Sequence, residues 1–293
     1  MSLVHVALVS QTEKIKPAQL SAASAALQKQ VARDFGPLWG IQATVDAFPD
    51  LKKLPLGYWP VTVVDDINEP GAGGFHSDRN NQPFALVQWD EDWTVTASHE
   101  CLEMLADPYG NKLAVGQSLD PTQGQVQYLV EVCDPCEDKQ YAYAIDGVVV
   151  SDFYTPNYFD SAPARGVRYD FTGAIERPLQ VLENGYVSWH DPVSNHWFQV
   201  NLILDPSGKP VDIGVLDGSA KSIRNWVDGQ VRKHREGLRK GGKIGYGPHA
   251  AVGKITEKTS KAVKAVDQAQ VCRGEALIDQ ISRMIRPHPA GNR

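Results

Sequence analysis

The chain has 293 residues, 42% of them hydrophobic, and a formal net charge of −6. A hydrophobic share of this size argues against a disordered chain and allows one large core or two smaller ones. No apolar stretch reaches the roughly 20 residues that span a membrane, and the first ten residues lack the basic start and long apolar segment of a signal peptide. We therefore expect a cytoplasmic protein of the α+β class.

Hydrophobic patterns place the elements of the first half of the chain in a simple order. Residues 3–9 are predicted to form a buried strand, and residues 17–35 an alanine-rich helix with Pro17 in its first turn. Further strands are predicted over residues 41–48, 58–65 and 84–89. The glycine-rich segment 70–74 and His76 are expected to form a mobile wall of a cleft, because they lead into a strand and not into the helix that a phosphate-binding loop requires.

The segment 96–105 carries the strongest chemical signal in the chain. It places His99, Glu100 and Glu103 in an H-E-x-x-E array, directly after the last of these strands. In a helix His99 and Glu103 fall about 40° apart and one turn from each other, as two ligands of one cation must. Apolar and small residues occupy the opposite side, so the acidic face is expected to look into a cleft. The alternative is an amphipathic helix whose acidic residues face water.

A catalytic zinc ion keeps three protein ligands and one open position. The densest group of further ligands lies at residues 128–138, where Glu131 interrupts an apolar, strand-like run over 126–132. A lone carboxylate in such a run is costly to bury, so we predict Glu131 as the third ligand beside His99 and Glu103, with Asp134 in reserve. The alternative for Glu131 is a carboxylate that pairs with an arginine or with backbone amides.

The order of elements and the H-E-x-x-E helix resemble the N-terminal half of the zincin metallopeptidases, whose helix carries H-E-x-x-H. The resemblance implies a mixed sheet with an active-site helix and an edge strand, here residues 84–89, that binds an extended peptide or protein substrate. Several segments are also similar to a group of uncharacterised bacterial proteins, which supplies no activity. They lie at residues 58–66, 83–87, 98–108, 131–135 and 150–153.

If a metal is bound, the roles of the neighbouring residues follow from its chemistry. Glu100, beside the ligands, would act as general base toward a metal-bound water. Tyr154 or Tyr158 could donate a phenol hydrogen bond to the oxyanion, although packing is the alternative for both. Zinc suits the site, but manganese, iron and calcium would compete, because glutamate replaces the second histidine.

The four cysteines offer a rival metal site. Cys133 and Cys136 form a single C-x-x-C pair, and Cys101 and Cys272 are the only other thiols. Cys101 lies about 200° from His99 around the helix, on its core side. We therefore expect structural thiols, without a disulfide between Cys133 and Cys136.

Charge divides the chain into two parts. Residues 1–205 carry 12 Lys and Arg against 27 Asp and Glu, a balance of −15, whereas residues 206–293 carry 17 against 8, a balance of +9. We predict a zincin-like catalytic body over 1–205 and a basic, mainly helical extension over 206–293, with helices at 219–238 and 252–271 around a glycine-rich break. The extension is expected to dock on the acidic body; an acidic partner, nucleic acid or an anionic membrane is the alternative.

The sequence thus favours a metal-dependent hydrolase, a peptidase that uses metal-activated water. The competing hypothesis is a non-catalytic structural or assembly protein in which the same acidic residues bind a stabilising ion.

Overall fold

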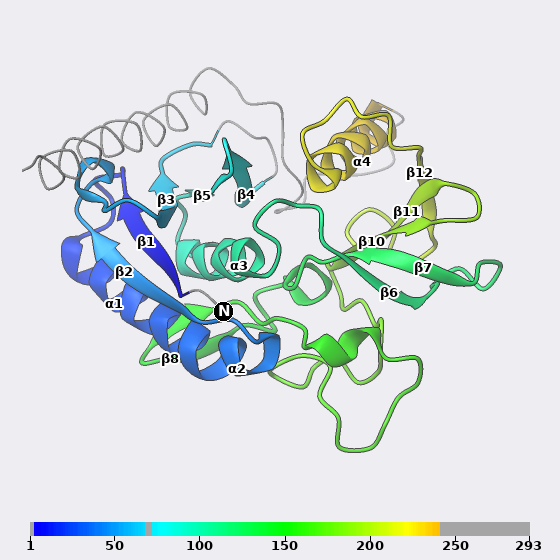
Figure 1. The fold of residues 1–293 in the computed structure, drawn as a ribbon, viewed down its shortest axis with the longest axis horizontal. Helices are drawn as coiled ribbons and strands as arrows, with labels where there is room; N and C mark the ends of the chain where they lie inside the picture. Colours follow the sequence, from blue (N-terminus) through cyan, green and yellow to red (C-terminus); the bar gives the residue numbers. More distant parts are fainter. Residues whose placement is uncertain (1–2, 68–71, 241–293) are drawn as a thin grey trace, which may run out of the picture.

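A computed structural model describes residues 3–67 and 72–240 (Figure 1). These residues form an α+β fold with two five-stranded sheets and a small hairpin. The predicted helix at 252–271 and Cys272 lie outside the described residues. In the part of the chain that the structure describes, no helix combines the length and the apolar character needed to cross a bilayer.

The first sheet, sheet A, has the strand order β2-β1-β3-β5-β4. The first four of these strands run parallel, and β4 is antiparallel to β5 at the sheet edge. The strand prediction for residues 84–89 is confirmed, but its predicted place at the edge is wrong, because β5 lies inside the sheet. The strands are β1 (Val4–Ser10), β2 (Ala43–Phe48), β3 (Tyr58–Val64), β4 (Gly74–Arg79) and β5 (Gln82–Gln88).

Helices α1 (Pro17–Lys29) and α3 (Trp93–Ala106) cover one face of sheet A. Their buried side chains share one core with the inward residues of the strands, such as Val6, Val61 and Val87. The chain continues beyond α1 in wider, π-helical turns at Gln30–Phe35 and then in α2 (Gly36–Trp39). The opposite face is apolar too, as is typical of parallel strands, and it packs partly against the short 3-10 turn Leu51–Lys53.

The second sheet, sheet B, is antiparallel throughout, with the order β12-β11-β10-β7-β6. The predicted strand-like run at 126–132 corresponds to β7, although β7 ends before Glu131. The strands are β6 (Leu113–Gln117), β7 (Gln125–Leu129), β10 (Tyr186–Asp191), β11 (His196–Asn201) and β12 (Val211–Gly214); the separate hairpin is β8 (Tyr143–Ile145) and β9 (Val148–Val150).

The described part of the predicted extension, residues 206–240, forms β12 and helix α4 (Ile223–Lys240). α4 lies against sheet B through an apolar group that contains Trp226, Val227, Trp197 and Leu129. Figure 1 shows α3 and α4 on either side of the segment that joins the two sheets, so the two helices approach the same region from different parts of the chain.

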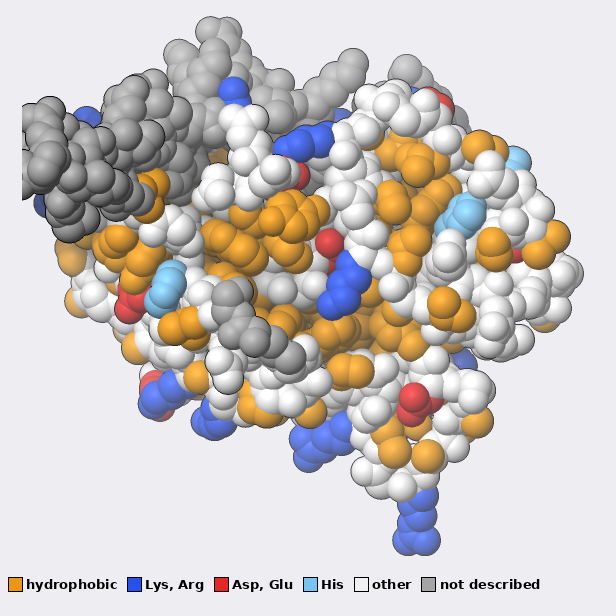
Figure 2. Space-filling model, viewed as in Figure 1, with side chains coloured by type: hydrophobic (Ala, Val, Ile, Leu, Met, Phe, Trp, Pro, Cys, Tyr) orange, Lys and Arg blue, Asp and Glu red, His pale blue; other side chains and the backbone are white. Residues whose placement is uncertain are grey.

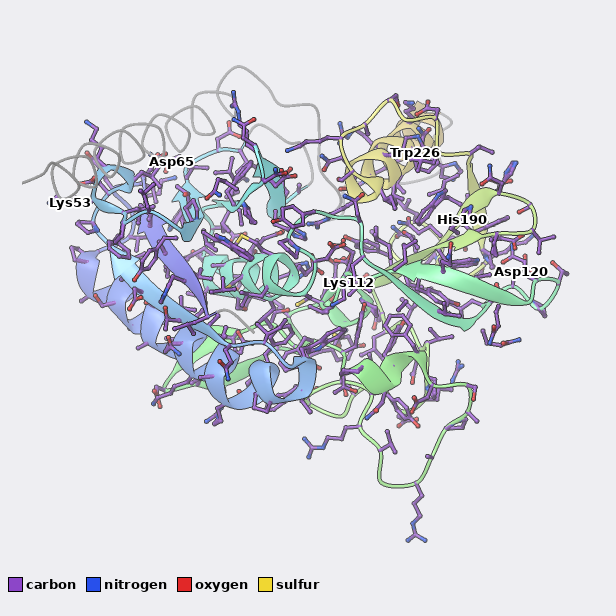
Figure 3. All side chains as sticks on the ribbon, viewed as in Figure 1. Lys53, Asp65, Lys112, Asp120, His190 and Trp226 are labelled. Atoms are coloured by element: carbon purple, nitrogen blue, oxygen red, sulfur yellow. The ribbon has the colours of Figure 1, made fainter. Side chains whose placement is uncertain are left out.

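The connection from α3 to sheet B is short and well anchored. Lys112, labelled in Figure 3, precedes β6, and its ammonium group donates to the carbonyl oxygen of Ala106 at the end of α3. Its backbone N–H donates to the Asp107 carboxylate at 2.7 Å. On the face shown in Figure 2, hydrophobic side chains cover much of the middle, and acidic and basic side chains are interspersed rather than gathered into one patch.

Candidate metal centre

Helix α3 carries the H-E-x-x-E residues, but its acidic face is buried. Glu100 is 3% exposed and Glu103 is fully buried. The expectation that this face looks into an open cleft is therefore wrong, and so is the alternative that it faces water. Both carboxylates instead meet side chains from β4 and from α4, and Glu103 also meets the segment after β7. We call Glu100, Glu103, Glu131, Asp134 and Asp228 the acidic cluster.

His99 and Asp134 form the part of this site with the clearest ligand geometry. His99 Nε2 lies 3.3 Å from Glu103 Oε2 and 3.3 Å from Asp134 Oδ1. Two ligand atoms at zinc-binding distance from a tetrahedral ion are separated by about 3.4 Å. Asp134 reaches this point because it opens the 3-10 turn Asp134–Cys136 that follows β7. The imidazole nitrogen thus lies at ligand spacing from one oxygen of each of these two carboxylates.

Glu131, the predicted third ligand, reaches the same cluster from another side. Carboxylate oxygens of Glu103, Glu131 and Asp134 all lie within 4.8 Å of one another. Glu131 Oε2 is paired with Arg224 Nε at 3.0 Å. The structure therefore brings Glu131 close to Glu103, and it also contains the arginine pair that was the alternative for this residue.

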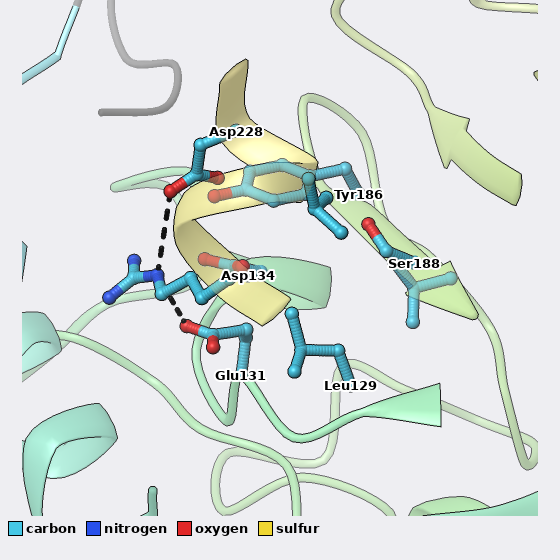
Figure 4. A pocket seen from close by; sticks show the side chains of 9 residues that line it. Leu129, Glu131, Asp134, Tyr186, Ser188 and Asp228 are labelled. Atoms are coloured by element: carbon cyan, nitrogen blue, oxygen red, sulfur yellow. Dashed lines mark ion pairs between the residues drawn. The ribbon is translucent and has the colours of Figure 1, made fainter. Parts of the chain in front are cut away.

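Arg224, at the start of α4, is the cation of the acidic cluster. Its Nη2 lies 3.2 Å from Glu103 Oε2, and its Nη1 and Nε lie 3.9 Å from Glu100 Oε2 and Asp228 Oδ2. Its side chain is only 6% exposed. The dashed lines in Figure 4 mark its ion pairs with Glu131 and Asp228. Sequence reasoning missed Arg224, because nothing local distinguishes it from the other basic residues of the extension.

The backbone fixes the position of Arg224. Its N–H donates to the carbonyl oxygen of Gly110 at 3.0 Å, and the N–H of Ile223 donates to Asn111 Oδ1 at 2.9 Å. Gly110 has a φ of +64°, and a Cβ there would lie 2.9 Å from the Cβ of Arg224. A glycine is needed at this turn for both reasons. The turn that ends α3 thus holds the start of α4.

His76 also belongs to the site, and its prediction as part of a mobile wall is wrong. It lies in β4, 1% exposed, with Nε2 3.1 Å from the Asp107 carbonyl oxygen. Its Nδ1 accepts from Arg224 Nη1 and lies 3.5 Å from Glu100 Oε2. A Cβ at Gly74 would lie 3.0 Å from Glu100 Oε1. Part of the glycine-rich segment therefore lets β4 approach α3.

A small cavity opens beside Arg224, with room for about one water molecule at about 10 Å³. Glu131, Asp134, Asp228, Tyr186 and Ser188 line it (Figure 4). Within the described residues, Glu131 Oε1 and Asp134 Oδ1 accept no hydrogen bond. The centre of the site is therefore polar, nearly closed and short of donors.

Buried carboxylates determine the electrostatics. Burial, and then the charge of Glu103, raises the pKa of Asp134 to about 7. Burial also raises the pKa of Glu131 well above its ordinary value, although Arg224 opposes this. Burial lowers the pKa of His99, but the Glu103 and Asp134 carboxylates outweigh it, so this pKa is raised well above the ordinary value. The cluster holds more negative charge than its own cations offset.

The two candidate phenols lie in a packed aromatic group. The rings of Tyr154 and Tyr158 are stacked with centroids 4.4 Å apart, and both residues are almost fully buried. Among the described residues no hydrogen bond or ion pair joins Tyr158 to Glu100. This arrangement fits the alternative that Tyr154 and Tyr158 serve in packing and not in catalysis.

The cysteines of the described chain are free and buried. Cys133 touches the site through its backbone, whose N–H donates to Glu103 Oε1 at 3.1 Å. Its thiol, with His99 and Glu103, also satisfies the spacing of a ligand set. Burial raises the pKa of Cys133 well above its ordinary value, which disfavours the thiolate that binds metals. All three thiols lie in the main core, but no group of ligand-type side chains among the described residues contains two of them.

Comparison with protein-family models, curated proteins and solved structures found no match to this chain.

Proposed function

We propose that the acidic cluster binds one divalent cation through His99, Glu103 and Asp134, and that the protein is a metal-dependent hydrolase of the zincin-like peptidase type. Asp134, the reserve ligand, replaces Glu131 as the proposed third ligand. Zinc fits a set of one imidazole and two carboxylates, and manganese, iron and calcium are its competitors. The observation that carries the proposal is the 3.3 Å spacing of His99 Nε2 from both carboxylates.

The charge balance supports a cation independently of this spacing. The five carboxylates of the acidic cluster share one guanidinium and two imidazoles, and all five are at least nine-tenths buried. Buried charges in proteins are paired, bind metals or become neutral by taking up protons. The raised pKa values of Glu131 and Asp134 correspond to the last outcome. A divalent ion would replace those protons.

The proposed reaction assigns Glu100 the role of general base. A metal in this place would acidify a bound water and polarise a carbonyl group. Glu100 follows His99 directly on α3, and its Oε2 accepts no hydrogen bond from the described residues, although it lies 3.5 Å from His76 Nδ1 and 3.9 Å from Arg224 Nη1. We do not assign a step to Tyr158, because its ring packs against Tyr154 and Phe159.

An extended peptide is the substrate class that suits the surroundings. β4 is the edge strand of sheet A and pairs with β5 on one side. An edge strand can bind a peptide backbone by strand addition. Val95, one helical turn before His99, lines an open surface depression of about 630 Å³ together with Asp92, Asp138 and Lys139. We propose this side of α3 as the approach for substrate.

Burial gives specific support to the non-catalytic alternative, a stabilising ion in a structural or assembly protein. The His99 side chain is 12% exposed and Glu103 is fully buried. The cavity beside Arg224 holds only about one water molecule. Docking of the basic extension on the acidic body, supported by Arg224, fits either function. Three free buried thiols support a cytoplasmic location.

The test begins with metal content. Protein purified without chelators and supplied with zinc, manganese, iron or calcium should hold about one ion per chain. Asp134→Asn should lower metal affinity by roughly 10-fold or more, whereas Glu131→Gln should lower it less. No bound metal under any of these conditions would overturn both the hydrolase and the structural-ion proposals.

A hydrolysis assay then distinguishes the hydrolase proposal from the structural-ion proposal. Wild type and Glu100→Gln should hold the same amount of metal, and only wild type should cleave a proteome-derived peptide library read by mass spectrometry. Glu176→Gln makes the same substitution at an exposed position and should retain cleavage. Metal that raises thermal stability, without any cleavage by wild type, would leave the structural role and reject the hydrolase.

A further inference from the structure

Arg224 lies at a second group of ligand-type side chains. His76, Glu100 and Glu103 each offer one atom within 4.8 Å of the others. The Arg224 guanidinium touches this group on every member: Nη1 donates to His76 Nδ1 and lies 3.9 Å from Glu100 Oε2, and Nη2 lies 3.2 Å from Glu103 Oε2. Glu103 Oε2 is shared with the first group, where it faces His99.

The orientation of His76 is that of a residue facing a cation. Arg224 Nη1 is closer to His76 Nδ1 than to His76 Nε2, which lies 3.2 Å from it, and a guanidinium can only donate. The tautomer that fits therefore carries its proton on Nε2, which lies 3.1 Å from the Asp107 carbonyl oxygen. Its Nδ1 therefore presents a lone pair to Arg224. Metal-bound histidines are held in the same way, with the second ring nitrogen donating to a backbone carbonyl or carboxylate.

We propose that Arg224 occupies the second cation position of a two-position centre, so that the wild-type protein binds one divalent ion and uses a guanidinium as its second cation. This inference rests on the proposed metal position at His99, Glu103 and Asp134. His76 and Glu100 supply the other ligands of the second position.

The Arg224 guanidinium is held firmly in its position. The side chain is 6% exposed, and α4 is held by the bonds from Arg224 to Gly110 and from Ile223 to Asn111. Trp226 and Val227 anchor the same turn of α4 against sheet B. An exposed arginine could leave when metal arrives, but this one would have to pull the start of a packed helix with it.

The two positions differ in the charge that they hold. A single guanidinium offsets less of the acidic cluster than a second divalent ion would, and it cannot bind water as a ligand. The second position would therefore hold His76 and Glu100 in place, while all metal-bound water stays at the first position. Removal of the guanidinium should open a position that a metal can fill.

The experiment counts zinc ions by native mass spectrometry and elemental analysis at saturating Zn²⁺. Wild type should bind one ion, and Arg224→Met should bind two. Arg224→Lys, which keeps one positive charge, should bind one. The double variant Arg224→Met with His76→Ala should return to one. Lys233→Met removes a charge from an exposed position of the same helix and should leave the wild-type count of one.

The outcomes separate this inference from the proposed function. One ion in both wild type and Arg224→Met overturns the second position and leaves the hydrolase proposal intact. No ion in either overturns the metal centre itself. No ion in wild type with one in Arg224→Met means that Arg224 competes for the only position, which also overturns the inference.

A second measurement needs no substitution, in case Arg224→Met does not fold, as judged by circular dichroism. Crystals of wild type soaked in Zn²⁺ should show one anomalous peak, between His99, Glu103 and Asp134, with the Arg224 guanidinium still beside His76. An anomalous peak between His76 and Glu100 would overturn the inference.

Discussion

Removal of the Arg224 guanidinium is the sharpest test of how the acidic cluster is stabilised. In Arg224→Met the side chain keeps an apolar stem of similar length but loses its contacts with Glu131 at 3.0 Å and Glu103 at 3.2 Å. Both carboxylates are buried, so neither regains its pairing from bulk water. The substitution therefore leaves buried negative charge uncompensated, which is the expensive way to break an ion pair.

The expected magnitude follows from this burial. Breaking a buried pair by removing one partner costs about 3–5 kcal/mol of unfolding free energy. In a protein of this size each kcal/mol lowers Tm by about 2–4 °C, so a fall of roughly 6–20 °C is expected. An exposed pair would cost about 1 kcal/mol or less. The stability loss expected for a buried pair is therefore clearly larger than the loss expected for an exposed pair.

The assay is urea unfolding of metal-free protein at pH 7, followed by tryptophan fluorescence. Lys233→Met should change stability by no more than about 0.5 kcal/mol, because its side chain is exposed. Adding Glu103→Gln to Arg224→Met should restore part of the loss, because Glu103 Oε2 lies 3.2 Å from the guanidinium and the amide carries no charge to compensate. A coupling of about 1 kcal/mol or more is expected between such neighbours. A loss below about 1 kcal/mol in Arg224→Met, or strict additivity in the double variant, would refute the reasoning.

Three further predictions concern the packing and protonation around the site. Gly74→Ala places a Cβ 2.8 Å from Thr96 Cγ2 and 3.0 Å from Glu100, and should destabilise by about 1–3 kcal/mol, whereas Gly124→Ala, with nothing within 4 Å, should be near neutral in the same urea titration. Burial, and then Asp170, raises the pKa of Asp152 from 3.8 to about 8, so the folded state keeps a proton that the unfolded state loses. Its stabilising contribution is complete below about pH 4 and is lost as pH rises to about 8. The stability difference between wild type and Asp152→Asn should change across that window by up to about 1.4 kcal/mol per pH unit, and a flat difference would contradict the shift. Burial raises the pKa of Cys133 and of Cys136 well above the ordinary value; peptide mapping after iodoacetamide treatment should find both unlabelled in native protein and labelled in urea, and rapid native labelling would contradict the burial.

Local hydrophobic pattern was enough to predict most elements of the first half. β1, β3 and α3 follow from short apolar runs or helical periodicity, which are properties of neighbouring residues. β4 was missed because its sequence, GFHSDR, is mostly polar and begins with glycine. It is a strand because β5 pairs with it, from Gly74 opposite Val87 to Arg79 opposite Gln82. Because β4 pairs with β5, β5 lies inside the sheet and not at the predicted edge.

Only those parts of the candidate site that come from residues close together in the sequence could be predicted. His99 and Glu103 meet because they are one turn apart on a helix, and the ligand-rich segment 128–138 did supply Glu131 and Asp134. Arg224 pairs with a carboxylate 121 positions away and donates to His76 148 positions away. No periodicity connects such residues. A buried Glu131 predicted some arginine partner, but it did not indicate which one.

The glutamate at position 103 is better explained by these contacts than as a defective second histidine. Glu103 Oε1 accepts the backbone N–H of Cys133 at 3.1 Å, while Oε2 lies 3.3 Å from His99 and 3.2 Å from Arg224. A neutral imidazole has a single lone pair and could satisfy one of these neighbours. A carboxylate has two oxygens and a negative charge, so it can bind the turn after β7, face His99 and offset the guanidinium at once. In this fold the H-E-x-x-E pattern and Arg224 therefore depend on each other, and a histidine at position 103 would leave the arginine without its closest partner on α3.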